Sequence, residues 1–221
     1  MRAALRRARD LGFLGEGPLE AQLEHSSGFA DAAAAAGMAD PPAAFLDLGS
    51  GGGVPGLVLA ARWPRADVVL VDANERRCAA LREAVESSGW QARARVVQAR
   101  AEAAAREPEL RGSFELVVAR SFAAPAVTAE CAAPFLRPGG LLVVSEPPLP
   151  EEPGADDAAG GAQDRATGHA GRWPSAGLEP LGLTPVRFVR ARFSYQVLRQ
   201  ETLCPDRYPR REGVPAKRPL Y

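Results

Sequence analysis

One glycine-rich segment, residues 45–56 with the sequence FLDLGSGGGVPG, constrains the fold of this chain more than any other. The short apolar run at 45–48 predicts a buried strand, and five glycines fall within the next eight residues. Pro55 stands where a helix would begin, because its fixed φ suits the first helical turn. Glycines also remove the Cβ atoms that would keep a ligand away from backbone amides. The segment therefore predicts a strand, a loop and a helix that bind a nucleotide-type cofactor.

Composition and cysteine spacing exclude several classes of protein. The 221 residues fit one domain of ordinary size, and 46% are hydrophobic, which is enough for a full core. No apolar run approaches the roughly 18 residues of a membrane span, and the charged N-terminus lacks the apolar core of a signal peptide. The three cysteines lack the spacing of metal ligands; they are Cys78, Cys131 and Cys204. We therefore expect a cytoplasmic protein with no membrane contact, disulfide framework or metal site.

Apolar strands alternate with helices along the middle of the chain. Two closing strands, at 184–191 and 193–199, are predicted to form a hairpin at one edge of the sheet. Strands that are nearly all apolar and separated by helices are typical of a parallel sheet covered on both faces. The predicted class is therefore α/β, a mostly parallel sheet with a closing antiparallel hairpin. The other strands are predicted at 45–48, 67–72, 93–98, 114–119 and 141–144, and the helices at 54–62, 75–87, 101–107 and 125–136.

The two ends of the chain differ from this central pattern. Residues 1–40 form a predicted N-terminal helical region, with helices over about 1–24 and 27–36 and an interruption at 15–18. Residues 41–204 form the predicted cofactor-binding domain, in which residues 147–177, rich in Pro, Gly, Ala and Asp, are a flexible insertion. Residues 205–221 form a basic C-terminal tail, with five basic side chains against two acidic ones.

Two overlapping glycine patterns in the loop favour different cofactors. Residues 51–56 satisfy G-x-G-x-x-G, the dinucleotide fingerprint, and residues 49–53 satisfy the G-x-G-x-G of class I S-adenosylmethionine (AdoMet) methyltransferases. Asp72 closes the second strand, where it can accept hydrogen bonds from the ribose hydroxyls of either cofactor. Asp47 favours AdoMet, because a carboxylate repels a pyrophosphate and attracts a sulfonium or an ammonium group. The sequence therefore favours AdoMet over NAD.

Three segments resemble the RsmG (GidB) family, which methylates N7 of a guanine in bacterial 16S ribosomal RNA. They are the glycine-rich segment at 45–56, the ARSFA sequence at 119–123 and the tail sequence RYPRREGVPAKRPL at 207–220, which is the most specific. The resemblance covers most of residues 20–145 and the tail. It implies a class I AdoMet-dependent methyltransferase (Rossmann-like) fold, AdoMet as the cofactor, and 16S ribosomal RNA or the small ribosomal subunit as the partner.

The resemblance and the loop together define an expected site. Arg120 follows the fourth strand and is the expected catalytic residue, with a cofactor contact as well. Glu102 is either a partner of the adenine amine or a solvated glutamate stabilised by the dipole of its own helix. His25 resembles part of a family element on the N-terminal helices and fits a surface or capping role equally well. The other expected cofactor contacts are Gly49, Gly51, Gly53, Val54, Asp72 and Ala101.

Methyl transfer to guanine N7 makes modest demands on an active site. N7 carries an available lone pair, so the reaction is an in-line displacement in which the enzyme supplies positioning and electrostatics. An exocyclic-amine methyltransferase would show Asn/Asp-Pro-Pro-Tyr/Phe after the fourth strand, where this chain has Arg120, Ser121 and Phe122. A cytosine-C5 enzyme needs a nucleophilic cysteine, and neither Cys131 nor Cys204 is suitably placed. Phe122 either stacks on a splayed base or packs in the core.

The basic tail can supply phosphate contacts, which position RNA without reading its sequence. The alternative is an ordinary solvated terminus. Deletion of residues 205–221 is predicted to spare AdoMet binding and to weaken RNA binding in a salt-sensitive way. The expected RNA-binding residues are Arg207, Arg210, Arg211, Lys217 and Arg218.

Glu146 departs from the family pattern. The sequence VSEP at 144–147 stands where the family usually carries a Leu-Lys-Gly-like end to the fifth strand. A carboxylate therefore replaces a positive group that could meet an RNA phosphate or orient the guanine. Two alternative functions follow. One is a divergent methyltransferase that acts on another RNA or a small molecule, and the other is a catalytically silent ribosome- or RNA-binding relative.

Overall fold

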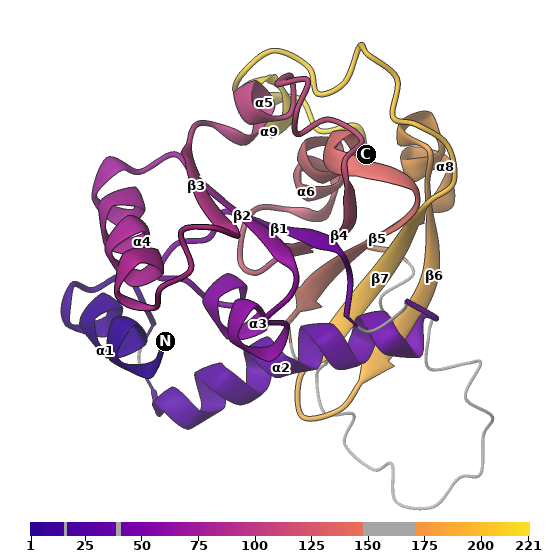
Figure 1. The fold of residues 1–221 in the computed structure, drawn as a ribbon. Helices are drawn as coiled ribbons and strands as arrows, with labels where there is room; N and C mark the ends of the chain where they lie inside the picture. Colours follow the sequence, from indigo (N-terminus) through magenta and orange to yellow (C-terminus); the bar gives the residue numbers. More distant parts are fainter. Residues whose placement is uncertain (16, 39–40, 148–170) are drawn as a thin grey trace, which may run out of the picture.

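The computed structural model of the chain describes residues 1–15, 17–38, 41–147 and 171–221. They contain one seven-stranded sheet with the strand order β3-β2-β1-β4-β5-β7-β6 (Figure 1). The first five strands along the chain pair in parallel, and β7 runs antiparallel to both β5 and β6. The predicted α/β sheet with a closing hairpin is therefore confirmed. The strands are β1 (Ala44–Leu48), β2 (Asp67–Asp72), β3 (Ala94–Gln98), β4 (Phe114–Ala119), β5 (Leu136–Glu146), β6 (Leu183–Arg190) and β7 (Ser194–Gln200).

Helices cover both faces of this sheet (Figure 1). Alternate residues of β1 divide between two cores: Phe45 packs with side chains of α2, α3 and α4, and Leu46 packs with side chains of α5 and α6. Because strand side chains alternate between the faces, an apolar run of this kind buries both of them. The helices are α1 (Arg2–Asp10), α2 (Leu19–Ala35), α3 (Gly56–Arg62), α4 (Glu75–Ser87), α5 (Ala101–Ala104), α6 (Pro125–Ala132), α8 (Ser175–Leu178) and α9 (Val214–Lys217), with 3-10 turns η1 (Ala133–Phe135) and η3 (Glu179–Leu181).

The strand order reverses between β1 and β4, which pair side by side at the centre of the sheet. The chain leaves β1 toward α3 on one face and leaves β4 toward α6 on the other. Ligands of open α/β sheets bind at the carboxyl ends of the strands beside such a reversal. The loops that follow Leu48 and Ala119 therefore flank the position where a cofactor is expected.

Helix α2 is longer than predicted. It runs without a break from Leu19 to Ala35, so the predicted interruption between residues 24 and 27 is wrong. Ser26 stays within the helix by donating its hydroxyl to the carbonyl oxygen of Gln22, at 2.7 Å. Gly28 lets the ring of Tyr195 lie directly against the helix, because a Cβ there would collide with the phenol. Packing against β7 thus overrides the weak helix propensity of these small residues.

Strand β5 also begins earlier than predicted, at Leu136 and not at residue 141. Leu136 pairs with Phe114 of β4, and Leu141 pairs with Leu116. The register shifts between these two pairs, where the glycine turn of β5 lies. The turn that was expected to separate helix from strand therefore lies inside the strand.

Most of the predicted insertion at 147–177 lies outside the described residues, which resume at 171. The described end of it is ordered around Trp173, whose side chain is buried in the second core, and α8 follows at once. The tail beyond residue 204 packs on the same core through Tyr208. The division of the chain at residues 40 and 204 stays a prediction.

Candidate functional site

The glycine loop turns sharply at the carboxyl end of β1. The backbone amides of Gly49 and Ser50 both donate to the carbonyl oxygen of Val71 in β2, at 2.9 Å. Gly49 has a φ of +75°, and a Cβ there would lie 2.6 Å from the ring of Phe122. Gly53 adopts a φ of +93°. Residues other than glycine rarely adopt positive φ angles of this size. The turn therefore requires the glycine pattern recognised in the sequence.

Asp47 lies beneath this loop and is fully buried. Its Oδ2 accepts a hydrogen bond from the amide of Gly56 at 2.8 Å, at the start of α3. Its Oδ1 has no hydrogen-bond partner among the described residues. Burial raises the pKa of Asp47 to about 7, and the nearby charge of Arg120 lowers it only in part. A buried carboxylate with a vacant acceptor oxygen is an environment that favours a cationic ligand.

Asp72 ties the loop to the end of β2. Its Oδ2 accepts from the amide of Gly51 and its Oδ1 accepts from the amide of Asn74, each at 2.8 Å. Each carboxylate oxygen retains a second lone pair, which can accept a hydroxyl proton. The predicted ribose-binding residue is thus rigidly held beside the glycine loop.

A cavity of about 360 Å³ opens beside these residues. Its volume lies within the range of small-molecule sites, of order 300 to 1,000 Å³. Helices α5, α6 and α9 contribute Ala101, Val127, Cys131 and Ala216 to its lining, together with the carboxylate of Glu102. Of the expected cofactor contacts, Gly49, Asp72, Ala101 and Glu102 line the cavity, whereas Gly51, Gly53, Val54 and Arg120 do not.

Arg120 lies on the other side of the loop, between β4 and α2. Its Nη2 donates to the side-chain oxygen of Gln22, and its Nη1 has no hydrogen-bond partner among the described residues. Burial lowers the pKa of Arg120, while Tyr195 and Asp47 act in the opposite direction. The guanidinium therefore holds a free donor close to the buried carboxylate of the loop.

His25 belongs to α2 and lies close to Arg120, which follows β4. Its ring stacks on Phe193 with a centroid separation of 4.3 Å, and its carbonyl oxygen accepts from the hydroxyl of Tyr195 at 2.7 Å. Burial first, and then the charge of Arg120, lower the pKa of His25 to about 4. The imidazole is therefore neutral at physiological pH, and its buried Nε2 has no partner among the described residues. Sequence reasoning left its role open, and the structure groups it with Arg120.

The tail is anchored by an ion pair between Arg210 and a buried carboxylate, which the sequence did not suggest. Glu130 of α6 is completely buried and receives the guanidinium of Arg210 through two oxygens, with Nε–Oε1 at 2.8 Å and Nη2–Oε2 at 2.6 Å. The sequence feature that could have indicated this ion pair is Glu130 itself, the one acidic residue among the apolar and small residues of α6. The other four cations expected to bind RNA are exposed: Arg207, Arg211, Lys217 and Arg218.

Glu146 points into the protein. Its side chain is 1% exposed and accepts from Arg172 Nε at 2.6 Å and from the indole nitrogen of Trp173 at 2.9 Å. The carboxylate that departs from the expected family pattern is therefore an internal partner of Arg172 and Trp173. It presents no negative charge to a substrate.

Thiol chemistry is disfavoured throughout the described structure. Burial raises the pKa of Cys131 and of Cys204 to about 12, and it raises the pKa of Cys78 as well. A thiol of this kind does not form the thiolate that nucleophilic catalysis requires. The described residues contain no group of three or more His, Cys, Asp or Glu side chains able to hold a metal ion. None of their helices is both long and apolar enough to cross a membrane.

Comparison with known proteins gives consistent matches. A family model described as "rRNA small subunit methyltransferase G" matches residues 25–147. Relatives named "Ribosomal RNA small subunit methyltransferase G" include one from Deinococcus deserti, 39% identical over 177 residues, which are 80% of this chain and 68% of the relative. One from Rubrobacter xylanophilus is 40% identical over 178 residues, 79% of this chain and 64% of the relative. One from Symbiobacterium thermophilum is 33% identical over 219 residues, 92% of this chain and 80% of the relative.

Solved structures with low sequence identity share the fold. An O-methyltransferase family protein from Burkholderia thailandensis superposes with a TM-score of 0.55 at 14% identity, covering 83% of this chain and 58% of its own. The cyclase SpnF superposes with a TM-score of 0.56 at 15% identity, covering 81% of each chain. Because one of these proteins is called a cyclase, the likeness concerns architecture and not activity.

Proposed function

The chain belongs to the rRNA small subunit methyltransferase G family, and we propose that it transfers a methyl group from AdoMet to N7 of a guanine in 16S ribosomal RNA. The observation that supports this proposal is the position of two carboxylates at the glycine loop: Asp47 is buried beneath the loop, and Asp72 lines the cavity beside it. A fully buried carboxylate with a vacant oxygen, next to a ribose-type acceptor at Asp72, suits a cationic nucleoside. It does not suit the pyrophosphate of a dinucleotide.

The residues of the cavity fit the parts of AdoMet in order. Asp72 would accept the ribose hydroxyls, and the apolar lining residues Ala101 and Val127 would hold the flat base. Near Gly49, which also lines the cavity, the buried charge of Asp47 would attract the positive charge of the methionine portion. When bound there, AdoMet supplies a methyl group on a positively charged sulfur.

Arg120 and His25 would position the methyl acceptor. Arg120 Nη1 is a free donor, and arginine recognises the O6 and N7 edge of guanine. His25 is neutral, so its Nε2 can share a hydrogen bond without adding charge beside the reacting base. Guanine N7 needs no proton removed before attack, so these residues have to orient the base and exclude water.

The exposed cations of the tail would hold the RNA backbone. Arg207, Arg211 and Arg218 are free of the buried pair that occupies Arg210. Glu146 is compatible with an RNA substrate, because its carboxylate is buried and hydrogen-bonded to Arg172 and Trp173. A cytoplasmic location follows from the ribosomal substrate in this proposal.

Two measurements test the proposal. Calorimetry should detect AdoMet binding and no comparable affinity for NAD. Mass-spectrometric mapping of 16S ribosomal RNA, from cells with and without the gene, should show one guanine N7 methylation that depends on it. AdoMet binding without any change in 16S RNA would instead indicate another acceptor, and absence of AdoMet binding would indicate a silent relative.

A further inference from the structure

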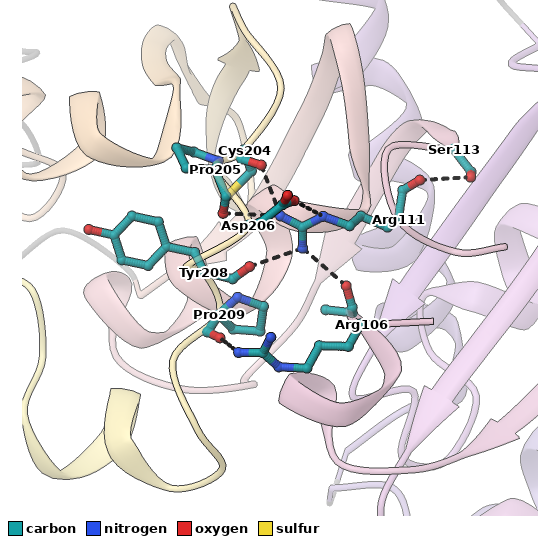
Figure 2. Close-up of polar contacts among 9 residues, drawn as sticks. Arg106, Arg111, Ser113, Cys204, Pro205, Asp206, Tyr208 and Pro209 are labelled. Atoms are coloured by element: carbon teal, nitrogen blue, oxygen red, sulfur yellow. Dashed lines mark hydrogen bonds and ion pairs between the residues drawn. The ribbon is translucent and has the colours of Figure 1, made fainter. Parts of the chain in front are cut away.

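The C-terminal segment, residues 204–217, is held against the body of the protein by partly buried polar contacts. Arg111, in the loop after α5, donates from Nη1 to the carbonyl of Tyr208 and from Nη2 to the carbonyl of Cys204, both at 2.9 Å. Arg106 donates to the carbonyl of Pro209. Figure 2 shows both guanidinium groups pointing at the backbone of this segment. The contacts fix the path of the chain up to the residue before Arg210.

Two carboxylates then fix the next part of the segment. Glu130 binds the guanidinium of Arg210 and also accepts its backbone amide at 2.8 Å. Glu102 of α5 accepts the amide of Gly213 at 3.0 Å, where the chain adopts a φ of +73° to begin α9. An isolated helix of four residues is not stable, so α9 depends on these anchors for its position.

Helix α9 contributes to the wall of the cofactor cavity. Ala216 lines the cavity together with Ala101 of α5 and with Val127 and Cys131 of α6. Ala101 and Val127 are the side chains that the proposed function assigns to the adenine base, and Ala216 lines the same cavity. The tail therefore contributes Ala216 to the lining of the cavity. Glu130 holds the tail in place through Arg210 but does not itself line the cavity.

We propose that the Glu130–Arg210 ion pair is a latch that positions the C-terminal segment as a wall of the adenosine end of the AdoMet site. Glu130 and Arg210 are then positioning residues for the cofactor. The inference rests on the proposed function, because it takes AdoMet to be the occupant of the cavity. Neither residue lines the cavity. Arg210 Nη2 also donates to the carbonyl oxygen of Arg218 at 2.7 Å, directly after α9, so the pair acts through α9 and its Ala216.

The latch predicts a change in cofactor affinity. Removing Arg210 leaves the fully buried carboxylate of Glu130 without its cation, and the segment then spends much of its time undocked. If the docked form falls to about a tenth of the population, the apparent Kd for AdoMet rises about tenfold. The Kd for 5′-methylthioadenosine, which has the same adenosine end, should rise by the same factor.

The test compares Arg210→Ala with Arg93→Ala as a matched control. Arg93 is also partly buried and donates to the carbonyl oxygens of Ala60 and Ala66, at the amino ends of β2 and β3 and away from the cavity. Both ligands are titrated by calorimetry into each variant and into the wild type. In the wild type, AdoMet should also slow hydrogen exchange of residues 213–217, and this protection should be lost in Arg210→Ala.

The outcomes separate the two proposals. A wild type that binds no AdoMet overturns the proposed function. A wild type that binds AdoMet, with an Arg210→Ala variant of unchanged Kd and unchanged protection, overturns the latch. An equal loss in Arg93→Ala overturns it too, since the effect would then be general destabilisation. If Arg210→Ala does not fold, Arg210→Lys and Glu130→Gln replace it, and each should raise the Kd by a smaller factor than full removal.

Discussion

The buried carboxylate of Asp47 should make the stability of this protein depend on pH in a defined direction. Its pKa is raised by burial from 3.8 to about 7, a shift of about three units. At about 1.36 kcal/mol per unit, this corresponds to about 4 kcal/mol between the two protonation states. The folded form holds the proton more tightly than the unfolded form. The contribution of Asp47 to the free energy of unfolding is therefore fully present below about pH 4 and is lost as the pH rises through about 7.

Asp47→Asn isolates this effect, because the amide oxygen can still accept from Gly56 while the charge is gone. Urea unfolding of both proteins should be followed from pH 5 to pH 8. Over that range the wild type should lose about 3 kcal/mol relative to the variant, which corresponds to the two units between pH 5 and 7. Other titrating groups cancel in the comparison, so the difference reports on Asp47 alone.

Cofactor binding should couple to the same proton. A cationic ligand favours the ionised carboxylate, so AdoMet should bind the wild type more tightly as the pH rises through 7 and should release a proton below it. Calorimetry in buffers of different ionisation enthalpy measures that proton. Parallel unfolding curves for the wild type and Asp47→Asn from pH 5 to 8, with no proton release on binding, would refute the reasoning.

Three further changes test other parts of the site. Gly49→Ala places a Cβ against the Phe122 ring at a φ of +75°, so it should cost about 1–3 kcal/mol in urea unfolding and weaken AdoMet binding. Arg120→Lys should lower methyl transfer to 16S RNA by about 100-fold or more, with the Kd for AdoMet within about threefold of the wild type at pH 8.5. Neutralising the exposed tail cations should reduce the salt dependence of RNA binding and leave calorimetric AdoMet affinity unchanged; the residues are Arg207, Arg211, Lys217 and Arg218.

The fold was predictable because its signals are local. The apolar runs at β2 and β4 match the observed strands at both ends, since a strand buried on both faces is largely apolar. The start of β5 was not predictable, because it depends on Leu136 pairing with Phe114 of another strand. The uninterrupted α2 likewise depends on Tyr195, far away in the sequence. Local propensity cannot report a contact made after the chain has folded.

The site divides in the same way. The glycines of the loop and Asp72 were visible in the sequence, because a turn of this shape requires particular residues at fixed spacing. The grouping of His25 with Arg120 was not visible, since it depends on how α2 crosses the end of β4. The inward orientation of Glu146 depends on Trp173, which returns to the sheet only after residues 147–170.

The tail shows why counting charges along a sequence misassigns neighbours. Arg210 and Arg211 are adjacent in one basic string, yet Arg210 fills a buried carboxylate site while Arg211 is exposed. A buried carboxylate such as Glu130 strongly prefers a bidentate guanidinium. Arg210 therefore pairs with Glu130 and is not one of the exposed tail cations that could bind RNA. Deletion of residues 205–221 would therefore strip an internal anchor together with the external cations. On this geometry the deletion should weaken AdoMet binding as well as RNA binding, contrary to the expectation from sequence that it spares the cofactor.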